Sequence, residues 1–316
     1  MRAIGFMEFG GPEVLRVIDR PDPTPTEGEV VVAVAASTIN PTDLMTLSGL
    51  RAPMMKDLSP PYTAGMDFSG HVVSVGTGVS SLTPGQPVIG VVSPRRPAGG
   101  AHAAQVCVPA ASVAPVNPNT DLVAAATVPM NALTALLSFE LLGLQPGQTV
   151  LITGAAGMLG SLAAEIGMLD GYDVLASAGE KDWAFLRSLG IDNILPRDGG
   201  LVEAVRALRS EGVDGMIDGA LIGREVAHLV RDGGGIVSPR ASYQIDDARL
   251  NVSYVQVTKG IEDEEKILRI GRLLDEGRLT PRVAADGVFP VGEAADAYRM
   301  ARNGGVRGRV VITFGS

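Results

Sequence analysis

A strand, a glycine-rich turn and a helix follow one another at Thr149–Gly160, and this stretch constrains the fold more than any other. The residues TVLITGAAGMLG run from a hydrophobic strand into Gly154-x-x-Gly157-x-x-Gly160, directly before a helical segment. In such a turn the first glycine permits a tight reversal, the second leaves room for a pyrophosphate, and the third lets helix and strand pack closely. The helix N-terminus adds unpaired N–H groups and the positive end of the helix dipole. The stretch therefore predicts contacts with cofactor phosphates at Gly154, Ala155, Ala156, Gly157, Met158, Leu159 and Gly160.

Alternating strands and helices follow this turn. Helices are predicted at Ser161–Asp170, Asp182–Leu189, Leu201–Ser210 and Arg224–Val230, with short hydrophobic strands between them, and VSYVQV (Val252–Val257) is the last strand. Repeated βα units predict a doubly wound parallel sheet with right-handed crossovers. A glycine-rich turn at the head of such units indicates a dinucleotide site more strongly than three glycines alone. The alternative is a glycine-rich connection in an α/β domain that binds no ligand.

The two ends of the chain differ in character from this middle part. The first ~120 residues contain β-branched runs separated by glycine and proline turns, as at Val30–Ala35 and Pro87–Val92. After an amphipathic helix at Glu262–Glu276, the tail reads as strand, helix and strand. Because the tail resembles the beginning of the chain, we expect it to return there. This gives one domain from residues 1–122 and 278–316, with the cofactor domain, residues 123–277, inserted between them.

Charge and composition limit the possible partners. The formal net charge is −9 and no basic run occurs, which argues against nucleic acid and anionic membrane surfaces. The first residues lack the pattern of a signal peptide, and no uninterrupted apolar run reaches the ~18 residues of a membrane span. Cys107 is the only cysteine, so neither an intramolecular disulfide nor a thiolate-rich metal site can form. We expect a cytoplasmic protein with a small-molecule substrate.

The end of the second strand bears on the choice of cofactor. An NAD site typically has an acidic residue there to bind the ribose hydroxyls, whereas this chain has Val174–Gly179 without an acid. Ser177 can donate to a 2′-phosphate and Lys181 can neutralise it, while Glu180 argues the other way. We therefore expect NADPH. The alternative is that Lys181 is a solvated residue at the start of a helix.

In these features the chain resembles the zinc-independent quinone oxidoreductase branch of the medium-chain dehydrogenase/reductase superfamily. The resemblance covers nearly the whole chain. It is carried by Asn40-Pro41-Thr42-Asp43, AGMDFSGHVVSVGTGV (Ala64–Val79), GAHAAQVCVPA (Gly100–Ala110), Thr127-Val128-Pro129, ITGAAGMLG, FLRSLG (Phe185–Gly190) and VRGRVVITF near the end. It implies a Rossmann domain inserted in a GroES-like β-barrel domain.

The resemblance also implies roles for single residues. Asn40 would line the nicotinamide pocket, and Thr127, Val237 and Ser238 would contact the cofactor. Arg197 stands where relatives often carry a tyrosine near the adenosine phosphate, and a charge-assisted contact there would favour NADPH. The branch commonly forms homodimers through the last Rossmann strand, here Val252–Val257.

Zinc-dependent relatives place a cysteine and a histidine where this chain has Asn40 and Met66, so the resemblance implies no metal. The expected activity is hydride transfer from NADPH to an activated acceptor, a quinone or an α,β-unsaturated carbonyl compound. Water or a tyrosine would supply the proton, with Tyr62 as the first candidate and Tyr243 and Tyr254 as the alternatives. The alternatives are an enoyl or alkenal reductase of a biosynthetic pathway and a non-catalytic NADPH-binding protein.

Overall fold

The computed structural model describes residues 1–315, which form two compact units. The first, here called the β-rich unit, contains Met1–Met130, Thr258–Gly277 and the tail from Pro281 onward. The second, the α/β unit, contains Asn131–Val257 and Arg278–Thr280. The units differ from the expected domains mainly at Thr258–Gly277, which was expected in the cofactor domain but packs within the β-rich unit.

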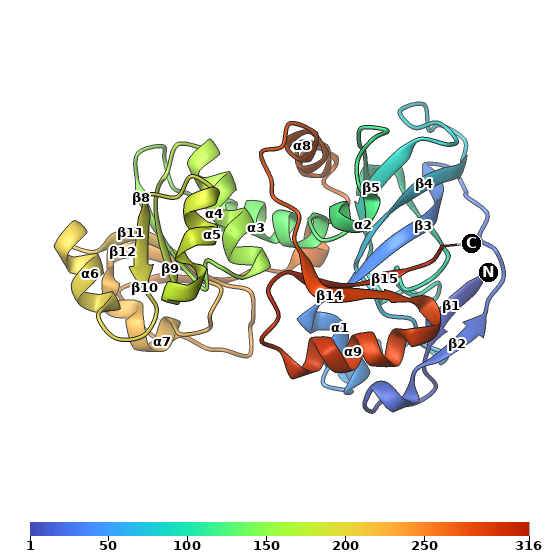
Figure 1. Cartoon of the computed structure of the whole chain (residues 1–316), viewed down its shortest axis with the longest axis horizontal. Helices are drawn as coiled ribbons and strands as arrows, with labels where there is room; N and C mark the ends of the chain where they lie inside the picture. Colours follow the sequence, from blue (N-terminus) through green and yellow to red (C-terminus); the bar gives the residue numbers. More distant parts are fainter. Residues whose placement is uncertain (316) are drawn as a thin grey trace. The chain divides into compact units, whose positions relative to one another are not determined.

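A seven-stranded sheet forms the framework of the β-rich unit (Figure 1). The strand order is β14-β15-β3-β4-β5-β7, with β6 also paired to β3. The strands are β3 (Glu29–Ile39), β4 (Asp67–Val75), β5 (Pro87–Val91), β6 (Gln105–Pro109), β7 (Val113–Pro115), β14 (Val283–Pro290) and β15 (Arg309–Thr313). A separate antiparallel pair joins β1 (Arg2–Gly5) and β2 (Arg16–Asp19). β15 pairs antiparallel with β3, so the end of the chain shares a sheet with its beginning.

The long strand β3 pairs with three other strands, β4, β6 and β15. Its β-branched run favours an extended conformation, and its pairing with β4 shifts register twice, between Val31 and Val32 and between Val34 and Ala36. Such irregularities bend a strand and increase its twist. Gly70 of β4 lies so close to β3 that an added Cβ would stand 1.9 Å from the Ala33 carbonyl oxygen. Only glycine fits at this approach.

Four α-helices of the described residues belong to this unit: α1 (Pro41–Leu47), α2 (Leu122–Ala125), α8 (Glu264–Asp275) and α9 (Ala294–Asn303). α9 is amphipathic, buries Ala297 and Tyr298, and packs on β14 and β15 (Figure 1). α8 buries Ile270 and Leu274 and packs on β7. This packing explains why the helix groups with the β-rich unit, since its apolar stripe needs a surface to cover. The short helix α1 was not expected from the sequence.

The α/β unit confirms the predicted doubly wound parallel sheet. Its six strands are all parallel, in the order β10-β9-β8-β11-β12-β13. Helices α4 and α5 lie on one face and α6 and α7 on the other (Figure 1). The strands are β8 (Thr149–Thr153), β9 (Asp173–Ala178), β10 (Asn193–Pro196), β11 (Val213–Asp218), β12 (Val230–Ser238) and β13 (Asn251–Tyr254). The helices are α3 (Pro129–Leu142), α4 (Met158–Leu169), α5 (Trp183–Ser188), α6 (Leu201–Leu208) and α7 (Gly223–Val226). β13 ends at Tyr254, three residues before the predicted end of this strand.

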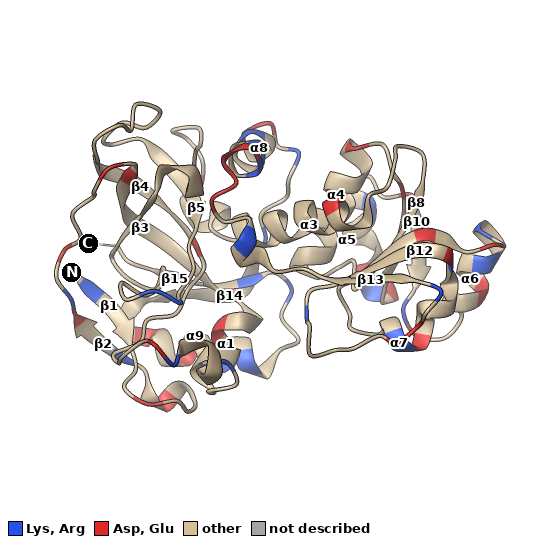
Figure 2. Cartoon of the chain, turned by 180° about the vertical axis from the view of Figure 1, so that it is seen from behind, with Lys and Arg blue, Asp and Glu red and all other residues tan. Residues whose placement is uncertain are grey.

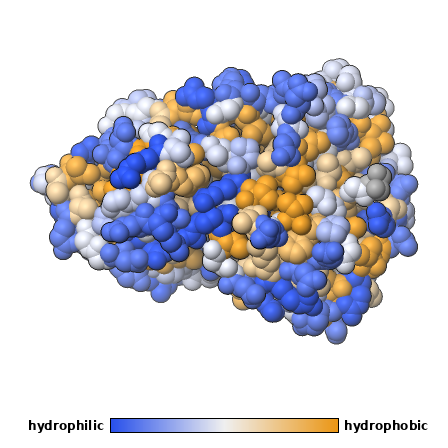
Figure 3. Space-filling model, viewed as in Figure 1, coloured by the Kyte–Doolittle hydropathy of each residue, from blue (hydrophilic) through white to orange (hydrophobic). Residues whose placement is uncertain are grey.

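Charged and apolar side chains are mixed over the surface. Figure 2 shows acidic and basic residues interspersed, without a large region of one sign. On the face drawn in Figure 3, hydrophilic residues predominate and hydrophobic residues gather in smaller groups among them. Leu122–Leu142 has the length and apolar composition of a membrane span, but 78% of its apolar window is buried inside the protein. A buried core helix has the same composition, so this feature does not indicate a membrane protein.

Candidate functional site

The glycine-rich turn between β8 and α4 has the geometry expected of a phosphate-binding turn. Gly154 has a φ of +63°, a left-handed conformation that glycine adopts without strain. Gly157 precedes α4 in an extended conformation, and its N–H donates to the Gly154 carbonyl at 2.9 Å. A Cβ on Gly160 would lie 2.4 Å from the Gly154 oxygen and 2.7 Å from the Ala155 Cα. The first and third glycines are therefore required by the backbone itself.

A buried carboxylate, Asp218, fixes the loop beside this turn. One of its oxygens accepts from the Thr153 hydroxyl at 2.7 Å and the other from the Gly223 N–H at 2.8 Å. The Thr153 hydroxyl in turn accepts from the Ala220 N–H at 3.1 Å. A Cβ on Gly154 would stand 3.1 Å from that same nitrogen, so the loop lies directly against the turn. Asp218 thus holds the glycine-rich turn and the β11–α7 loop together.

Ser177 does not present its hydroxyl at the exposed end of β9. The side chain is fully buried and donates to the Pro196 carbonyl on neighbouring β10 at 3.2 Å. The sequence indicated the correct strand end, but the fold buries this side chain against β10. Lys181, in the 3-10 helix η4 (Glu180–Asp182), is exposed. Of these two residues, only Lys181 is exposed to solvent, and its contact with a 2′-phosphate stays a prediction.

Arg197 follows β10 and is exposed, but it already has an anionic partner. Its guanidinium donates through Nε and Nη2 to both carboxylate oxygens of Asp198, at 3.0 to 3.3 Å. This hydrogen bonding raises the pKa of Arg197, and the charge of Asp182 adds to the effect. The strand ends at β9 and β10 therefore carry two basic side chains and several acidic ones.

Val237 and Ser238 lie at the end of β12, where both are buried. Ser238 pairs in register with Tyr254 of β13, and its hydroxyl accepts from the Arg240 N–H at 3.4 Å. They stand at the carboxyl edge of the same sheet as Gly154. In doubly wound sheets that edge is where ligands bind.

Asn40 belongs to a buried polar network in the β-rich unit. It lies between β3 and α1, and its side-chain Nδ2 donates to Asp67 at 2.6 Å and to the Thr38 hydroxyl at 3.3 Å. The Asn40 N–H donates to Asp43 at 2.8 Å, and the other Asp43 oxygen accepts from the Gly65 N–H at 2.9 Å. Both amide hydrogens of Asn40 are therefore engaged within this unit. A contact between Asn40 and the nicotinamide stays a prediction.

A second buried pair adjoins this network. The His102 Nε2 atom lies 3.1 Å from the Thr38 carbonyl oxygen, and its Nδ1 lies 3.0 Å from the Tyr298 hydroxyl. Because a carbonyl only accepts, Nε2 carries the hydrogen and Tyr298 donates to Nδ1. Burial lowers the pKa of His102 and raises that of Tyr298, so both are neutral. In the core, each side chain thus supplies the hydrogen-bond partner that the other needs.

Tyr62 and Thr127 both use their hydroxyls locally. Tyr62 donates to the Leu58 carbonyl at 3.3 Å and stacks on Phe9, with the ring centroids 5.3 Å apart. Thr127 donates to the Ala124 carbonyl at 2.7 Å and accepts from the Arg282 N–H at 3.1 Å. Neither arrangement shows the residue's predicted role, and both roles stay predictions.

The two positions where zinc-dependent relatives carry metal ligands are occupied here by Asn40 and Met66, whose side chains make other contacts. Met66 is buried, and its sulfur accepts from the Thr42 hydroxyl at 3.5 Å, while Asn40 bonds to Asp67. Cys107 is half-buried, and burial raises the pKa of its thiol to about 11. Among residues 1–315, no three His, Cys, Asp or Glu side chains are grouped so that they could hold a metal ion.

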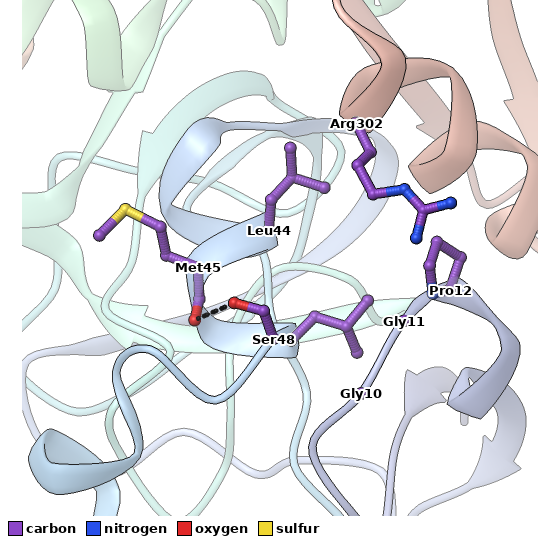
Figure 4. A pocket seen from close by; sticks show the side chains of 8 residues that line it. Gly10, Gly11, Pro12, Leu44, Met45, Ser48 and Arg302 are labelled. Carbon is purple, nitrogen blue, oxygen red and sulfur yellow. Dashed lines mark hydrogen bonds between the residues drawn. The ribbon is translucent and has the colours of Figure 1, made fainter.

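A small pocket of about 270 Å³ lies elsewhere in the β-rich unit (Figure 4). Its lining is mostly apolar, with Leu44 and Met45 from α1 on one side and Pro12 and Arg302 on the other. The Ser48 hydroxyl donates to the Met45 carbonyl at 3.2 Å. None of the residues predicted to bind cofactor or substrate lines it, and it offers no acid–base pair.

Two buried acids that hold the candidate site, Asp67 and Asp218, were not predicted from the sequence. Each is a fully buried acid at one end of an apolar strand, and each holds groups next to predicted site residues. That pattern, an acidic residue bordering a hydrophobic run, was visible in DFSGHVV and GMID. An acid in such a place is expected to be buried with the strand, and a buried carboxylate needs hydrogen-bond donors around it. The pattern therefore could have identified both residues.

Two family models match the chain. Residues 26–118 match the alcohol dehydrogenase GroES-like domain, and residues 189–312 match the zinc-binding dehydrogenase domain. The second range contains no cysteine and a single histidine, His228.

Several known proteins are similar to this chain over nearly its whole length. A chloroplast envelope quinone oxidoreductase homolog of Arabidopsis thaliana is 25% identical, with 99% of this chain and 98% of that protein covered. An NADPH-dependent alkenal/one oxidoreductase of the same plant is 25% identical, with 99% and 79% covered. The solved structure of an NAD-dependent alcohol dehydrogenase has 29% identity and a TM-score of 0.84, with both chains fully covered.

Proposed function

Since the chain belongs to the medium-chain dehydrogenase/reductase superfamily and is an oxidoreductase, we propose that it uses NADPH to reduce an activated acceptor without zinc. The acceptor is a quinone or an α,β-unsaturated carbonyl compound. The observation that carries the proposal is the turn at Gly154–Gly160, whose backbone is shaped for a dinucleotide.

The residues of the α/β unit fit a nicotinamide dinucleotide. The close packing at Gly160 brings the start of α4 against the turn, and the twelve-residue helix presents its first N–H groups there. These groups would hold the pyrophosphate. Asp218 would keep the adjacent loop in place. When bound, NADPH supplies a hydride to the acceptor, and the protein contributes position and surroundings.

The preference for NADPH over NADH rests on Lys181 and Arg197. No acidic side chain stands at the buried end of β9, where an NAD site has its ribose ligand. Lys181 is exposed beside that end and would pair with the 2′-phosphate. Arg197 would join it by exchanging Asp198 for the phosphate, because both anions accept the same pair of N–H groups.

Zinc independence rests on the residue types at the two ligand positions. A thioether that accepts a hydrogen bond and an amide bound to a carboxylate are poor zinc ligands compared with imidazole and thiolate. Without a Lewis acid, an alcohol would lack stabilisation of its alkoxide. A quinone or enone needs less help, since its own conjugation spreads the charge that arrives with the hydride.

The similar proteins include both a quinone oxidoreductase homolog and an alkenal/one oxidoreductase, so both acceptor classes belong to the proposal. A homodimer is proposed as well, formed through β13. This strand ends the parallel sheet, and an edge strand left open is prone to pair with another chain.

An acceptor screen tests the proposal. NADPH absorbance would be followed with quinones, 2-alkenals, enoyl thioesters and primary alcohols, using protein dialysed against a chelator and analysed for zinc. We expect oxidation of NADPH with a quinone or enone in the zinc-free protein. Tight NADPH binding with no acceptor reduced would indicate a binding protein, and turnover that requires zinc would refute the metal-free mechanism.

A further inference from the structure

Asp67 is a fully buried carboxylate to which three donors converge. It begins β4, and its Oδ2 accepts from the Thr38 hydroxyl at 2.8 Å and from the Asn40 amide at 2.6 Å. Its Oδ1 accepts from the backbone N–H of Met130 in a short hydrogen bond. Met130 is the second residue of α3, where the helix leaves N–H groups without partners of its own. One side chain therefore touches both Asn40 and the start of a helix.

We propose that Asp67 is a positioning residue: its carboxylate fixes the orientation of the Asn40 amide and holds the Met130 N–H at the start of α3. The inference rests on the proposed function, in which Asn40 contacts the reacting groups. Met130 is also the last residue of the β-rich unit before the chain enters the α/β unit. Asp67 thereby ties Asn40 to the point where the chain leaves this unit.

The donor set requires a carboxylate at this position. Thr38, Asn40 and Met130 each direct a hydrogen at Asp67, and a carboxylate has two acceptor oxygens for them. An asparagine of the same shape has one acceptor oxygen and one donor nitrogen. In an Asp67→Asn variant, at least one donor would face another donor, and either Asn40 or Met130 would lose its anchor.

The charges around Asp67 make the arrangement sensitive to pH. Burial raises the pKa of Asp67 to about 6, against the opposing effects of its three hydrogen bonds and of the Arg309 charge. Arg309, on β15, also faces the Asp43 carboxylate of α1, and its own pKa is lowered by burial. Protonation of Asp67 would weaken its hydrogen bonds from Asn40 and Met130. Burying a carboxylate is costly unless it is hydrogen-bonded, and these three donors supply the hydrogen bonds that Asp67 requires.

The first experiment measures by NMR whether Asp67 contacts both Asn40 and Met130, and it does not depend on enzymatic activity. Protein labelled with ¹⁵N-methionine and ¹⁵N-asparagine would give amide signals for Met130 and for the Asn40 side chain, assigned with Met130→Leu and Asn40→Ala. We expect both signals to shift together with a midpoint near the pKa of about 6. In Asp67→Asn the titration should be lost. Signals that stay constant from pH 5 to pH 8 in the unmutated protein would overturn the proposal.

The second experiment reads turnover. Asp67→Asn should lower kcat about 10- to 100-fold, the cost of misplacing a positioned group, with NADPH affinity almost unchanged. Asp67→Glu should recover part of the loss. The matched control is Asp121→Asn, which also removes a carboxylate that accepts from two helix N–H groups in this unit but lies exposed. It should leave turnover unchanged.

Three results distinguish a failure of the positioning role of Asp67 from a failure of the proposed function. Turnover of Asp67→Asn within twofold of the unmutated enzyme would contradict a positioning role. If that variant does not fold, the kcat of the unmutated enzyme should still fall as the pH drops through about 6, and a flat profile would contradict the role. If no acceptor is reduced at all, the proposed function fails, while the Met130 and Asn40 signals still report the coupling.

Discussion

The Nη2 atom of Arg197 lies 3.0 Å from the Oδ2 atom of Asp198, at the end of β10. The pair is exposed, and the bidentate geometry is the one a phosphate would need. In the proposed NADPH site, the 2′-phosphate would therefore compete with the Asp198 carboxylate for the Arg197 guanidinium. Lys181 has no such partner among the ion pairs of the described residues.

Removing the competing carboxylate should strengthen NADPH binding. In Asp198→Asn the guanidinium is released, so the ratio of NADPH to NADH affinity should rise severalfold. Lys181→Ala should lower the same ratio by about tenfold, the value of one charge-assisted contact. Fluorescence titration with each cofactor measures both effects. Equal affinity for NADPH and NADH in the unmutated protein would contradict the assignment.

A methyl group at Gly160 should damage the cofactor site. Its Cβ would stand 2.4 Å from the Gly154 oxygen, so strand, turn and helix would have to move apart. We expect Gly160→Ala to lower the free energy of unfolding by ~1–3 kcal/mol and to weaken NADPH binding. Gly292→Ala is the control, because a Cβ there meets no atom within 4 Å. A Gly160→Ala protein with normal affinity would show that the turn does not hold the cofactor.

Asp67 should make the unmutated protein less stable as the pH rises. Its pKa of about 6 in the folded protein lies above the usual 3.8, so the folded state binds this proton more tightly. The resulting stabilisation is complete below pH 3.8 and is lost as the pH rises through 6. Urea unfolding at pH 5 and pH 7.5 should show a larger loss of stability for the unmutated protein than for Asp67→Asn. Parallel changes in the two proteins would contradict the raised pKa.

The β13 edge gives a prediction about assembly. Val252 lies at the middle of a strand that ends the sheet, and we expect two such edges to pair in a homodimer. Sedimentation at micromolar concentration should show a dimer, and Val252→Pro, which removes a backbone donor from the strand, should shift it toward monomer. A monomer in the unmutated protein would refute this part of the proposal.

Local patterns predicted most of the architecture. The strand before Gly154 and the amphipathic residues of α8 and α9 specify their elements through hydrophobic periodicity, which depends only on neighbours in sequence. Helix α1 was not predicted because it has only seven residues and begins only two residues after the end of β3. Its start depends on the Asn40–Asp43 hydrogen bond, and Asp43 is also held by distant Gly65.

The candidate site was harder to predict than the fold. The glycine-rich turn was recognised because glycine alone meets its backbone requirements. The orientation of Ser177 was not, since it depends on β10 lying beside β9 and offering the Pro196 carbonyl. The convergence of Thr38, Asn40 and Met130 on Asp67 likewise involves positions far apart in sequence. Sequence patterns indicate which residues are polar, whereas tertiary pairing decides what each one binds.

The most direct test of the central claim is an isotope measurement on NADPH itself. The two forms of NADPH deuterated at C4 of the nicotinamide, one on each face, would be compared as reductants of the quinone or enone found in the screen. Hydride transfer to an activated acceptor predicts slower oxidation with one of the two forms only, in protein shown to be free of zinc. Oxidation of simple alcohols together with no acceptor-dependent loss of NADPH would contradict the account.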